Sequence, residues 1–189
     1  MKATISKESI TKALSLTGGI VEKKQTLPIL SNILIEFKDN SFKLVATDLE
    51  SELTIIGETD TCETEGITTA SAKKLNDLCR LIPDKSSIEL SLSGDKLNIS
   101  TKNGKYSLAT LPSNEFPIFE SGDKLHKINL KSQDLKTLIN TTAFAMGNQD
   151  WRHYLNGLFL KLEEGVLTAV ATDAHRLALN CLDSVSDIN

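Results

Sequence analysis

The stretch ATDAHRLAL, residues 171–179, places four polar and charged side chains within five positions: Thr172, Asp173, His175 and Arg176. An aspartate beside a histidine can orient a general base, and Ser184 could supply the nucleophile of a small hydrolase. A second candidate pair is Asp150 with His153. Neither set comes with a nucleophile elbow, a phosphate-binding loop or metal-ligand spacing. The sequence therefore predicts no catalytic residue, no metal and no cofactor.

The first three residues of this stretch recur in ATDLESELT, residues 46–54. Both copies contain the aspartate, but no histidine follows Asp48. A residue repeated at the end of a strand is more simply a turn or capping residue than a catalyst. We therefore interpret Asp173 as scaffold and expect function in the positions that differ, where Leu49 to Glu52 becomes Ala174 to Leu177.

The recurrence belongs to a longer repeat at an offset of 125 positions (155 − 30), which aligns residues 30–54 with residues 155–179 without a gap. Upstream, the same offset aligns two apolar stripes: Ile10, Ala13, Leu14 and Thr17 with Leu135, Leu138, Ile139 and Thr142. Their i, i+3, i+4, i+7 spacing is typical of amphipathic helices. In both copies the pattern then predicts two strands, joined by a tight turn at residues 38–41 or 163–166, and a further strand.

A helix of the same type is predicted in SAKKLNDLCRLIPD, with Ser71 as its N-cap and Pro83 ending it. Its apolar stripe consists of Leu75, Leu78, Cys79 and Ile82. The strands that follow turn at Gly94-Asp95 and at Asn103-Gly104, the second being typical of a type I′ hairpin. We therefore predict an α+β fold of tandem domains, each built from two halves in which a β-meander follows a helix.

The expected domains are a complete first domain over residues 1–120, a linker over residues 121–128 and the N-terminal half of a second domain over residues 129–189. The chain stops before any counterpart of the helix at residues 71–82. We therefore expect it to be a fragment of a longer protein.

Composition narrows the class of protein further. The sequence has no signal peptide and no apolar run long enough to span a membrane, which predicts a cytoplasmic protein. Its three cysteines are far apart and lack metal-ligand spacing, so we interpret them as structural thiols. The net charge of −4 (21 − 25) opposes general attraction to nucleic acid but allows one basic face.

Six segments in this order carry a resemblance to a known family: TLPILSNILI, VATDLESEL, CRLIPD, YSLATLPSNEFP, YLNGLFL and VATDAHRLAL. In these segments and their spacing, the chain resembles the bacterial DNA polymerase III β subunit, the sliding clamp, over all 189 residues. The resemblance implies a DNA clamp fold, with antiparallel sheets outside and helices lining the inner face of a ring around duplex DNA. It also implies a third domain, absent here, and a head-to-tail homodimer for the complete chain.

The function implied by the resemblance is that of a non-enzymatic processivity factor. Its partners would be duplex DNA, the DNA polymerase III catalytic subunit, the clamp loader and other DNA-processing proteins that dock through short linear motifs. Two alternatives stay open: a clamp-fold interaction scaffold that never encircles DNA, and the small hydrolase that would use Asp173 and His175.

The non-core faces of the predicted helices are lightly basic, which on sequence alone is more simply explained by solvation. The resemblance instead implies that they face DNA. The candidate DNA-binding residues on helices are Lys12, Lys73, Arg80 and Lys136. Family comparison adds loop residues: Lys23, Lys24, Gln149, His153 and Tyr154.

The resemblance also implies a pocket for partner peptides, an apolar floor with a rim of hydrogen-bond donors. Its candidate residues are Arg152, Leu155, Thr172, Ala174, His175, Arg176 and Leu177. Relatives often have glycine where this chain has Ala174, so the added methyl group would narrow the pocket. The alternative is that Leu155 and Leu177 are core residues and the charged pair is merely solvated.

A third implied surface is the subunit contact of the first domain, where an edge strand continues the partner's sheet. Its candidate residues are Lys74, Leu78, Lys96, Lys105, Tyr106 and Leu108.

Overall fold

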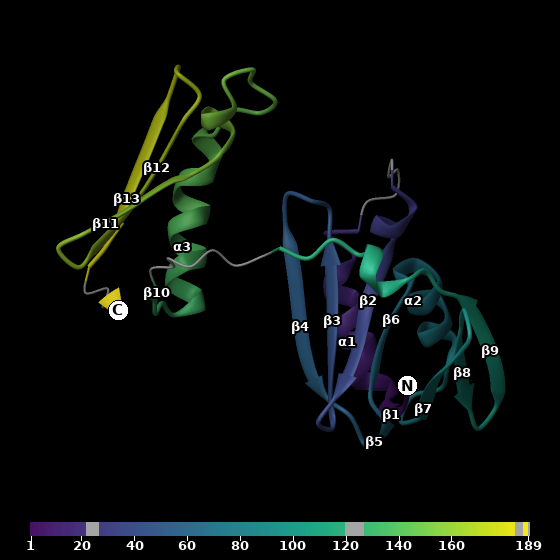
Figure 1. Ribbon diagram of the computed structural model, residues 1–189. Coiled ribbons are helices and arrows are strands. Elements are labelled where there is room, and N and C mark those ends of the chain that lie inside the picture. The colour runs from purple at the N-terminus through teal and green to yellow at the C-terminus, as the bar shows by residue number, and fades with distance from the viewer. Residues whose placement is uncertain (22–26, 120–126, 184–186, 189) are drawn as a thin grey trace. The chain divides into compact units, whose positions relative to one another are not determined.

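The computed structural model describes residues 1–21, 27–119, 127–183 and 187–188. The chain divides into two compact units, residues 1–120 and 121–189, and each is described by itself (Figure 1). Residues 121–126 of the expected linker lie outside the described residues, and its last two residues form a short strand. No helix in the described ranges is long and apolar enough to cross a membrane.

The described residues of unit 1 form two antiparallel sheets and two α-helices, which confirms the α+β class. Its elements are β1 (Lys2–Ser6), α1 (Lys7–Thr17), η1 (Pro28–Ser31), β2 (Asn32–Lys38), β3 (Ser41–Thr47), β4 (Glu52–Glu58), β5 (Thr61–Thr64), β6 (Gly66–Ser71), α2 (Ala72–Leu81), β7 (Ser87–Ser93), β8 (Lys96–Thr101), β9 (Gly104–Ala109) and η2 (Ser113–Glu115). The strand orders are β4-β3-β2-β6 and β5-β1-β7-β8-β9.

The two halves of unit 1 exchange strands. The strand that precedes α1 pairs with β7 of the second half, and β6, which precedes α2, pairs with β2 of the first half. Neither β1 nor β6 was predicted, although β1 has a short alternating pattern; β6 instead buries three consecutive residues, Thr68, Thr69 and Ala70. Because of this exchange, both helices and both sheets contribute to a single core.

The two helices of unit 1 begin where the sequence supplies a capping hydroxyl. The Oγ atoms of Ser6 and Ser71 accept hydrogen bonds from the backbone N–H groups of Ser9 and Lys74, at 3.2 and 3.4 Å. The predicted stripe of α1 is wholly buried, and α2 ends at Leu81, two residues before Pro83. The two helices pack against each other.

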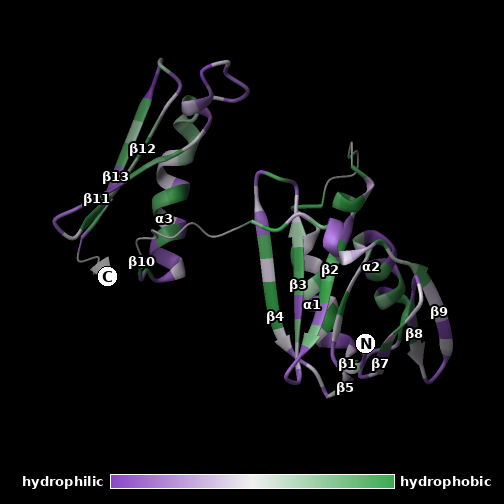
Figure 2. Ribbon diagram, in the orientation of Figure 1, coloured by the Kyte–Doolittle hydropathy of each residue, from purple (hydrophilic) through white to green (hydrophobic). Residues whose placement is uncertain are grey.

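The apolar side chains of β2 and β3 are buried on both faces of their sheet, and Figure 2 shows how apolar residues run along these strands. The inward face, with Ile33 and Ile35, joins the main core under the helices. The outward face, with Leu34 and Val45, is covered by Phe116, which follows η2. Segment 110–119 is fastened beside it, because Thr69 Oγ1 bonds both the N–H and the C=O of Leu111, at 3.1 and 2.8 Å.

Unit 2 repeats the first part of unit 1. Its elements are β10 (Lys127–Ile128), α3 (Ser132–Thr142), η3 (Ala143–Ala145), η4 (His153–Asn156), β11 (Phe159–Glu163), β12 (Val166–Thr172), β13 (Leu177–Leu182) and β14 (Asp187–Ile188). Adding 125 to the bounds of α1, η1 and β3 gives those of α3, η4 and β12. The predicted repeat is therefore confirmed at the level of single residues.

Two local predictions were wrong. Ile139, expected in the buried stripe of α3, is 40% exposed, whereas Leu138 and Thr142 are buried. The turn expected at Asn103-Gly104 lies one residue earlier, because Thr101 pairs with Gly104 across the hairpin. Thr101 Oγ1 accepts the N–H groups of Asn103 and Gly104, at 3.3 and 3.1 Å, and this side-chain contact sets the turn without the type I′ backbone.

Candidate functional site

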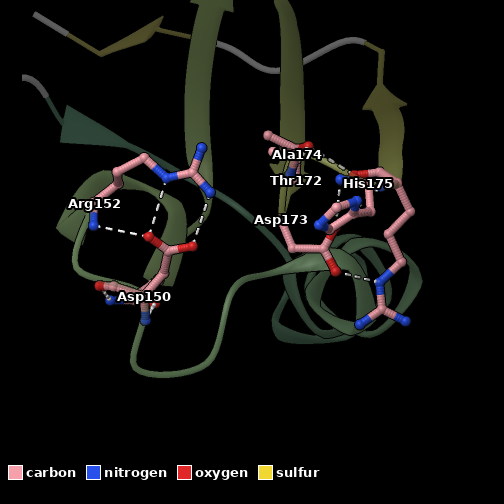
Figure 3. Close-up of polar contacts among 8 residues, drawn as sticks. Asp150, Arg152, Thr172, Asp173, Ala174 and His175 are labelled. Carbon is pink, nitrogen blue, oxygen red and sulfur yellow. Dashed lines mark hydrogen bonds and ion pairs between the residues drawn. The ribbon is translucent and has the colours of Figure 1, made fainter.

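The turn between β12 and β13 contains the residues that suggested catalysis, and its aspartate is engaged by the turn itself. Asp173 Oδ1 accepts the backbone N–H groups of His175 and Arg176, both at 3.0 Å, and Oδ2 accepts Arg176 Nε at 2.9 Å (Figure 3). The backbone hydrogen bonds lower the pKa of Asp173, with the Arg176 charge adding to the effect. A carboxylate held in this way is a turn residue, not the partner of a general base.

The corresponding turn of unit 1 has the same geometry. Asp48 Oδ1 accepts the N–H groups of Glu50 and Ser51, at 3.0 and 2.6 Å, and these bonds lower its pKa. The next residue, Leu49, has a φ of 75°, the same value as Ala174 in unit 2. The shared aspartate therefore serves the same turn in both units, as the repeat predicted. Ser184, the suggested nucleophile, lies outside the described residues.

The loop between η3 and β11, residues 147–156, holds the second candidate pair. The Asp150 carboxylate does not pair with His153 but forms a bidentate ion pair with Arg152, with Nε at 3.0 Å from Oδ1 and Nη2 at 2.9 Å from Oδ2. Arg152 also donates its backbone N–H to Oδ1, at 2.8 Å. These contacts lower the pKa of Asp150 to about 2, the Arg152 side-chain hydrogen bonds having the largest effect.

The loop and the turn stand on one small apolar cluster. Ala145 and Met146 precede the loop, Leu158 follows it, and Ala171 and Ala178 flank the turn. The cluster therefore brings together the candidate docking residues of both segments, and Figure 3 shows the loop and the turn at the same end of the sheet.

The candidate docking residues differ in exposure. Leu155 is buried, at 7% exposure, whereas Leu177 is 65% exposed at the start of β13. Thr172 Oγ1 donates to the backbone carbonyl of Arg176 at 2.7 Å, so this hydroxyl closes the turn. The Arg176 guanidinium lies 6.0 Å from the ring centre of exposed Phe144, a residue that sequence analysis did not single out. Leu155 thus fits the core alternative, and Leu177 does not.

The candidate DNA-binding residues fall into separate groups. Lys12 on α1 and Lys73 and Arg80 on α2 are exposed, and within the described residues none of the three forms an ion pair. Lys136 is exposed on α3 of unit 2. The exposed loop residues Gln149, His153 and Tyr154 all belong to the 147–156 loop. Lys23 and Lys24 lie outside the described residues.

The candidate subunit-contact residues lie on and beside β9, the edge strand of the five-stranded sheet. Four of them line a shallow groove of about 340 Å³ between α2 and β9: Lys74, Leu78, Tyr106 and Leu108. Successive side chains along a strand point to opposite faces of the sheet. Lys96 and Lys105, which pair with Ala109 and Ser100, therefore lie on the face away from the groove. The predicted set therefore divides between the two faces of the sheet.

Comparison with known proteins matches both units to domains of one protein family. The family described as DNA polymerase III beta subunit, N-terminal domain, matches residues 1–120, and its central domain matches residues 129–188. The beta sliding clamp of Pseudomonas putida is 40% identical over 179 residues, covering 95% of this chain and 49% of the relative. The chain thus spans about half the length of the relatives that it matches.

Solved structures show the same likeness. The crystal structure of the DNA polymerase III subunit beta from Pseudomonas aeruginosa matches 97% of this chain and 50% of its own, with a TM-score of 0.93 and 39% identity. A sliding clamp from the same organism, bound to griselimycin, matches the same shares with a TM-score of 0.91 and 40% identity.

Proposed function

Because this chain belongs to the DNA polymerase III beta subunit family, as the resemblance predicted, we propose that it acts in DNA replication as part of a sliding clamp. In this role it is a non-enzymatic, cytoplasmic processivity factor whose complete form closes into a head-to-tail homodimeric ring around duplex DNA. The observation that carries the proposal is the match of sequence and fold over 97% of the chain.

The DNA contact is assigned to the exposed cations of the helices. Lys12, Lys73 and Arg80 are free of acidic partners among the described residues, so their charges are available for phosphates. A clamp must slide, which favours sparse contacts with the phosphate backbone over base readout. A net charge of −4 with local basic faces suits this, because the rest of the surface does not attract DNA.

The partner contact is assigned to the 147–156 loop and the 172–177 turn of unit 2. Exposed Leu177 supplies apolar surface, and the guanidinium groups of Arg152 and Arg176 retain N–H donors beyond those bonded to aspartate. This chemistry suits a short linear motif with an apolar anchor. The clamp loader, the polymerase catalytic subunit and other DNA-processing proteins are the proposed partners.

The subunit contact is assigned to β9 and the groove beside it. An unpaired strand edge can accept a strand from a partner subunit, and exposed Leu81 extends the apolar groove.

The test of ring closure is retention of the full-length gene product on circular and linear DNA. A topological clamp stays on the circle and slides off the ends of the linear duplex. Equal retention on both would reject encirclement and favour the interaction scaffold.

The assignment of DNA contacts is tested by Lys12→Glu and Lys73→Glu, with Lys38→Glu at the exposed end of β2 as the matched control. Each helix variant should weaken DNA binding and reduce the slope of log K against log salt by about one. An unchanged slope in both helix variants would remove the assignment.

A further inference from the structure

The 147–156 loop carries candidates for two different contacts within ten residues (156 − 147 + 1). Gln149, His153 and Tyr154 are candidates for contact with DNA, whereas Arg152 is a candidate for contact with partner peptides. Because the two sets alternate along one short loop, a change in the shape of the loop displaces both. The contacts that hold the loop in shape therefore affect both proposed functions.

Asn156 closes the loop with a pair of hydrogen bonds. Its Oδ1 accepts the backbone N–H of Asp150 at 3.0 Å, and its Nδ2 donates to the Asp150 carbonyl at 2.9 Å. The N–H of Gly147 donates to the carbonyl of Leu155 at 2.8 Å and closes the base of the loop. A Cβ atom on Gly147 would lie 3.2 Å from Asn156 Oδ1 and 3.3 Å from Leu155 O, so any larger residue would crowd this closure.

The Asp150 carboxylate fixes the interior of the same loop. It accepts three hydrogen bonds from one residue, Arg152, and two of them form a planar bidentate pair. Such charge-assisted pairs are directional, so the guanidinium is oriented before any partner arrives. The 3-10 turn that contains His153 and Tyr154 begins directly after Arg152, whose backbone N–H is bonded to the Asp150 carboxylate.

We propose that Asp150 and Asn156 are positioning residues that preorganise one loop for both DNA and partner peptides. The inference rests on the proposed function, since it assumes that both contacts exist. Neither side chain needs to touch a ligand. Each acts by lowering the entropy lost when the loop binds, because the loop already has its binding shape.

The experiment uses the full-length gene product, with griselimycin as the probe of the docking site and a short fluorescent duplex as the probe of DNA contact. Asn156→Ala removes both bonds of the closure and should weaken the binding of both probes by about tenfold. The matched control is Asn180→Ala, which removes an exposed hydrogen bond to Thr141 in the same unit and should change neither affinity.

Asp150→Asn is the second variant, because it keeps the closure, which uses only the backbone of Asp150. It should weaken the binding of both probes. Its matched control is Glu163→Gln, which breaks the exposed ion pair with Lys161. In an Arg152→Ala background, Asp150→Asn should cause no further loss of griselimycin binding. A loss of the same size in both backgrounds would show a general effect on folding and would overturn the positioning role.

Two direct-contact variants separate failure of this inference from failure of the proposed function. Leu177→Ala should weaken griselimycin binding, and Tyr154→Ala should weaken DNA binding. If these two lose binding while Asp150→Asn and Asn156→Ala bind normally, the inference is wrong and the proposed function stands. If none of the four variants loses binding, the assignment of both contacts to this loop and turn fails and the inference fails with it, while retention on circular DNA still decides the clamp function. Should Asn156→Ala lose the circular dichroism of the folded chain, Asp150→Asn decides the outcome.

Discussion

Replacing Ala174 with glycine should stabilise unit 2, although the change removes a methyl group. Ala174 has a φ of 75°, in the left-handed region that L-residues avoid at a cost of about 1–2 kcal/mol. Glycine avoids this cost but loses about 0.4–1 kcal/mol more backbone entropy on folding. The Ala174 side chain is exposed, so no burial is lost. The net gain in the free energy of unfolding should be about 1 kcal/mol.

The assay is thermal and urea unfolding followed by circular dichroism. For domains of about 60–250 residues, a gain of about 1 kcal/mol corresponds to a rise in Tm of about 2–8 °C. The matched control is Ala143→Gly at the end of α3, where φ is −58° and ψ is −26°. There the same substitution relieves no strain and should lower the stability of the unit by about 0.5–1 kcal/mol.

The result that would refute this reasoning is equal destabilisation by the two substitutions. It would mean that the backbone at residue 174 is not strained, or that the two hydrogen bonds accepted by Asp173 Oδ1 compensate for the strain. The repeat supplies an independent check at Leu49, which has the same φ in unit 1. Its side chain is 48% exposed, so glycine there should gain less, because some packing is lost as well.

Three further predictions concern single side chains. Because its pKa is lowered, ionised Asp150 stabilises the folded state. This contribution to the free energy of unfolding should be intact above pH 3.8 and disappear as the pH falls through about 2. A carbon-13 titration of the carboxyl group that gave the ordinary pKa would contradict this. Phe116→Ala should destabilise unit 1 by about 3–5 kcal/mol in urea unfolding, whereas Phe119→Ala, at a half-exposed ring, should cost far less; similar losses would show that Phe116 does not seal the outer face. Burial raises the pKa of the Cys79 thiol to about 11, so at pH 8 a thiol reagent should modify exposed Cys181 quickly and Cys79 only after unfolding, and equal rates in the folded chain would contradict the burial.

The repeat was predictable because each copy preserves the pattern that its elements need. The stripe of α1 recurs in α3, and the aspartate of the β3–β4 turn recurs before β13, each at the same offset. Such features are local in sequence, since a helix stripe or a turn residue acts within a few positions. Comparison of the two copies also separated the turn aspartate from the side chains assigned to docking.

The exchange of strands between the halves was not predictable in the same way. Whether β6 pairs with β2 or with a strand of its own half depends on contacts between distant segments, which no local pattern encodes. The division of the β9 candidates between two faces was missed for a related reason. Register assigns Lys105 and Tyr106 to opposite sides, but the groove exists only because α2 lies beside that strand.

The positioning residues were missed because their chemistry looks ordinary in sequence. Asp150 was noticed only as a possible partner of His153, and Asn156 carried no signal beyond its place before Gly157. An asparagine that accepts from and donates to the same backbone residue stands in for a strand partner, and only coordinates show this. The available hint was a mostly polar segment bounded by Gly147 and Gly157, typical of a compact surface loop.

The two copies share one turn geometry but carry different side chains beside the turn. In unit 1, Glu52 accepts the N–H of Phe119 at 2.9 Å, and Phe116 covers Leu34 and Val45 on the outward face of the sheet. The residue that corresponds to Glu52 in unit 2 is Leu177 (52 + 125), which is 65% exposed. The counterpart of Leu34 is Phe159, which is 64% exposed. One position thus carries a carboxylate that holds a segment of its own chain in unit 1 and an exposed apolar side chain in unit 2. Since the turn geometry is the same in both units, the docking role proposed for unit 2 needs different side chains beside the turn but no different backbone.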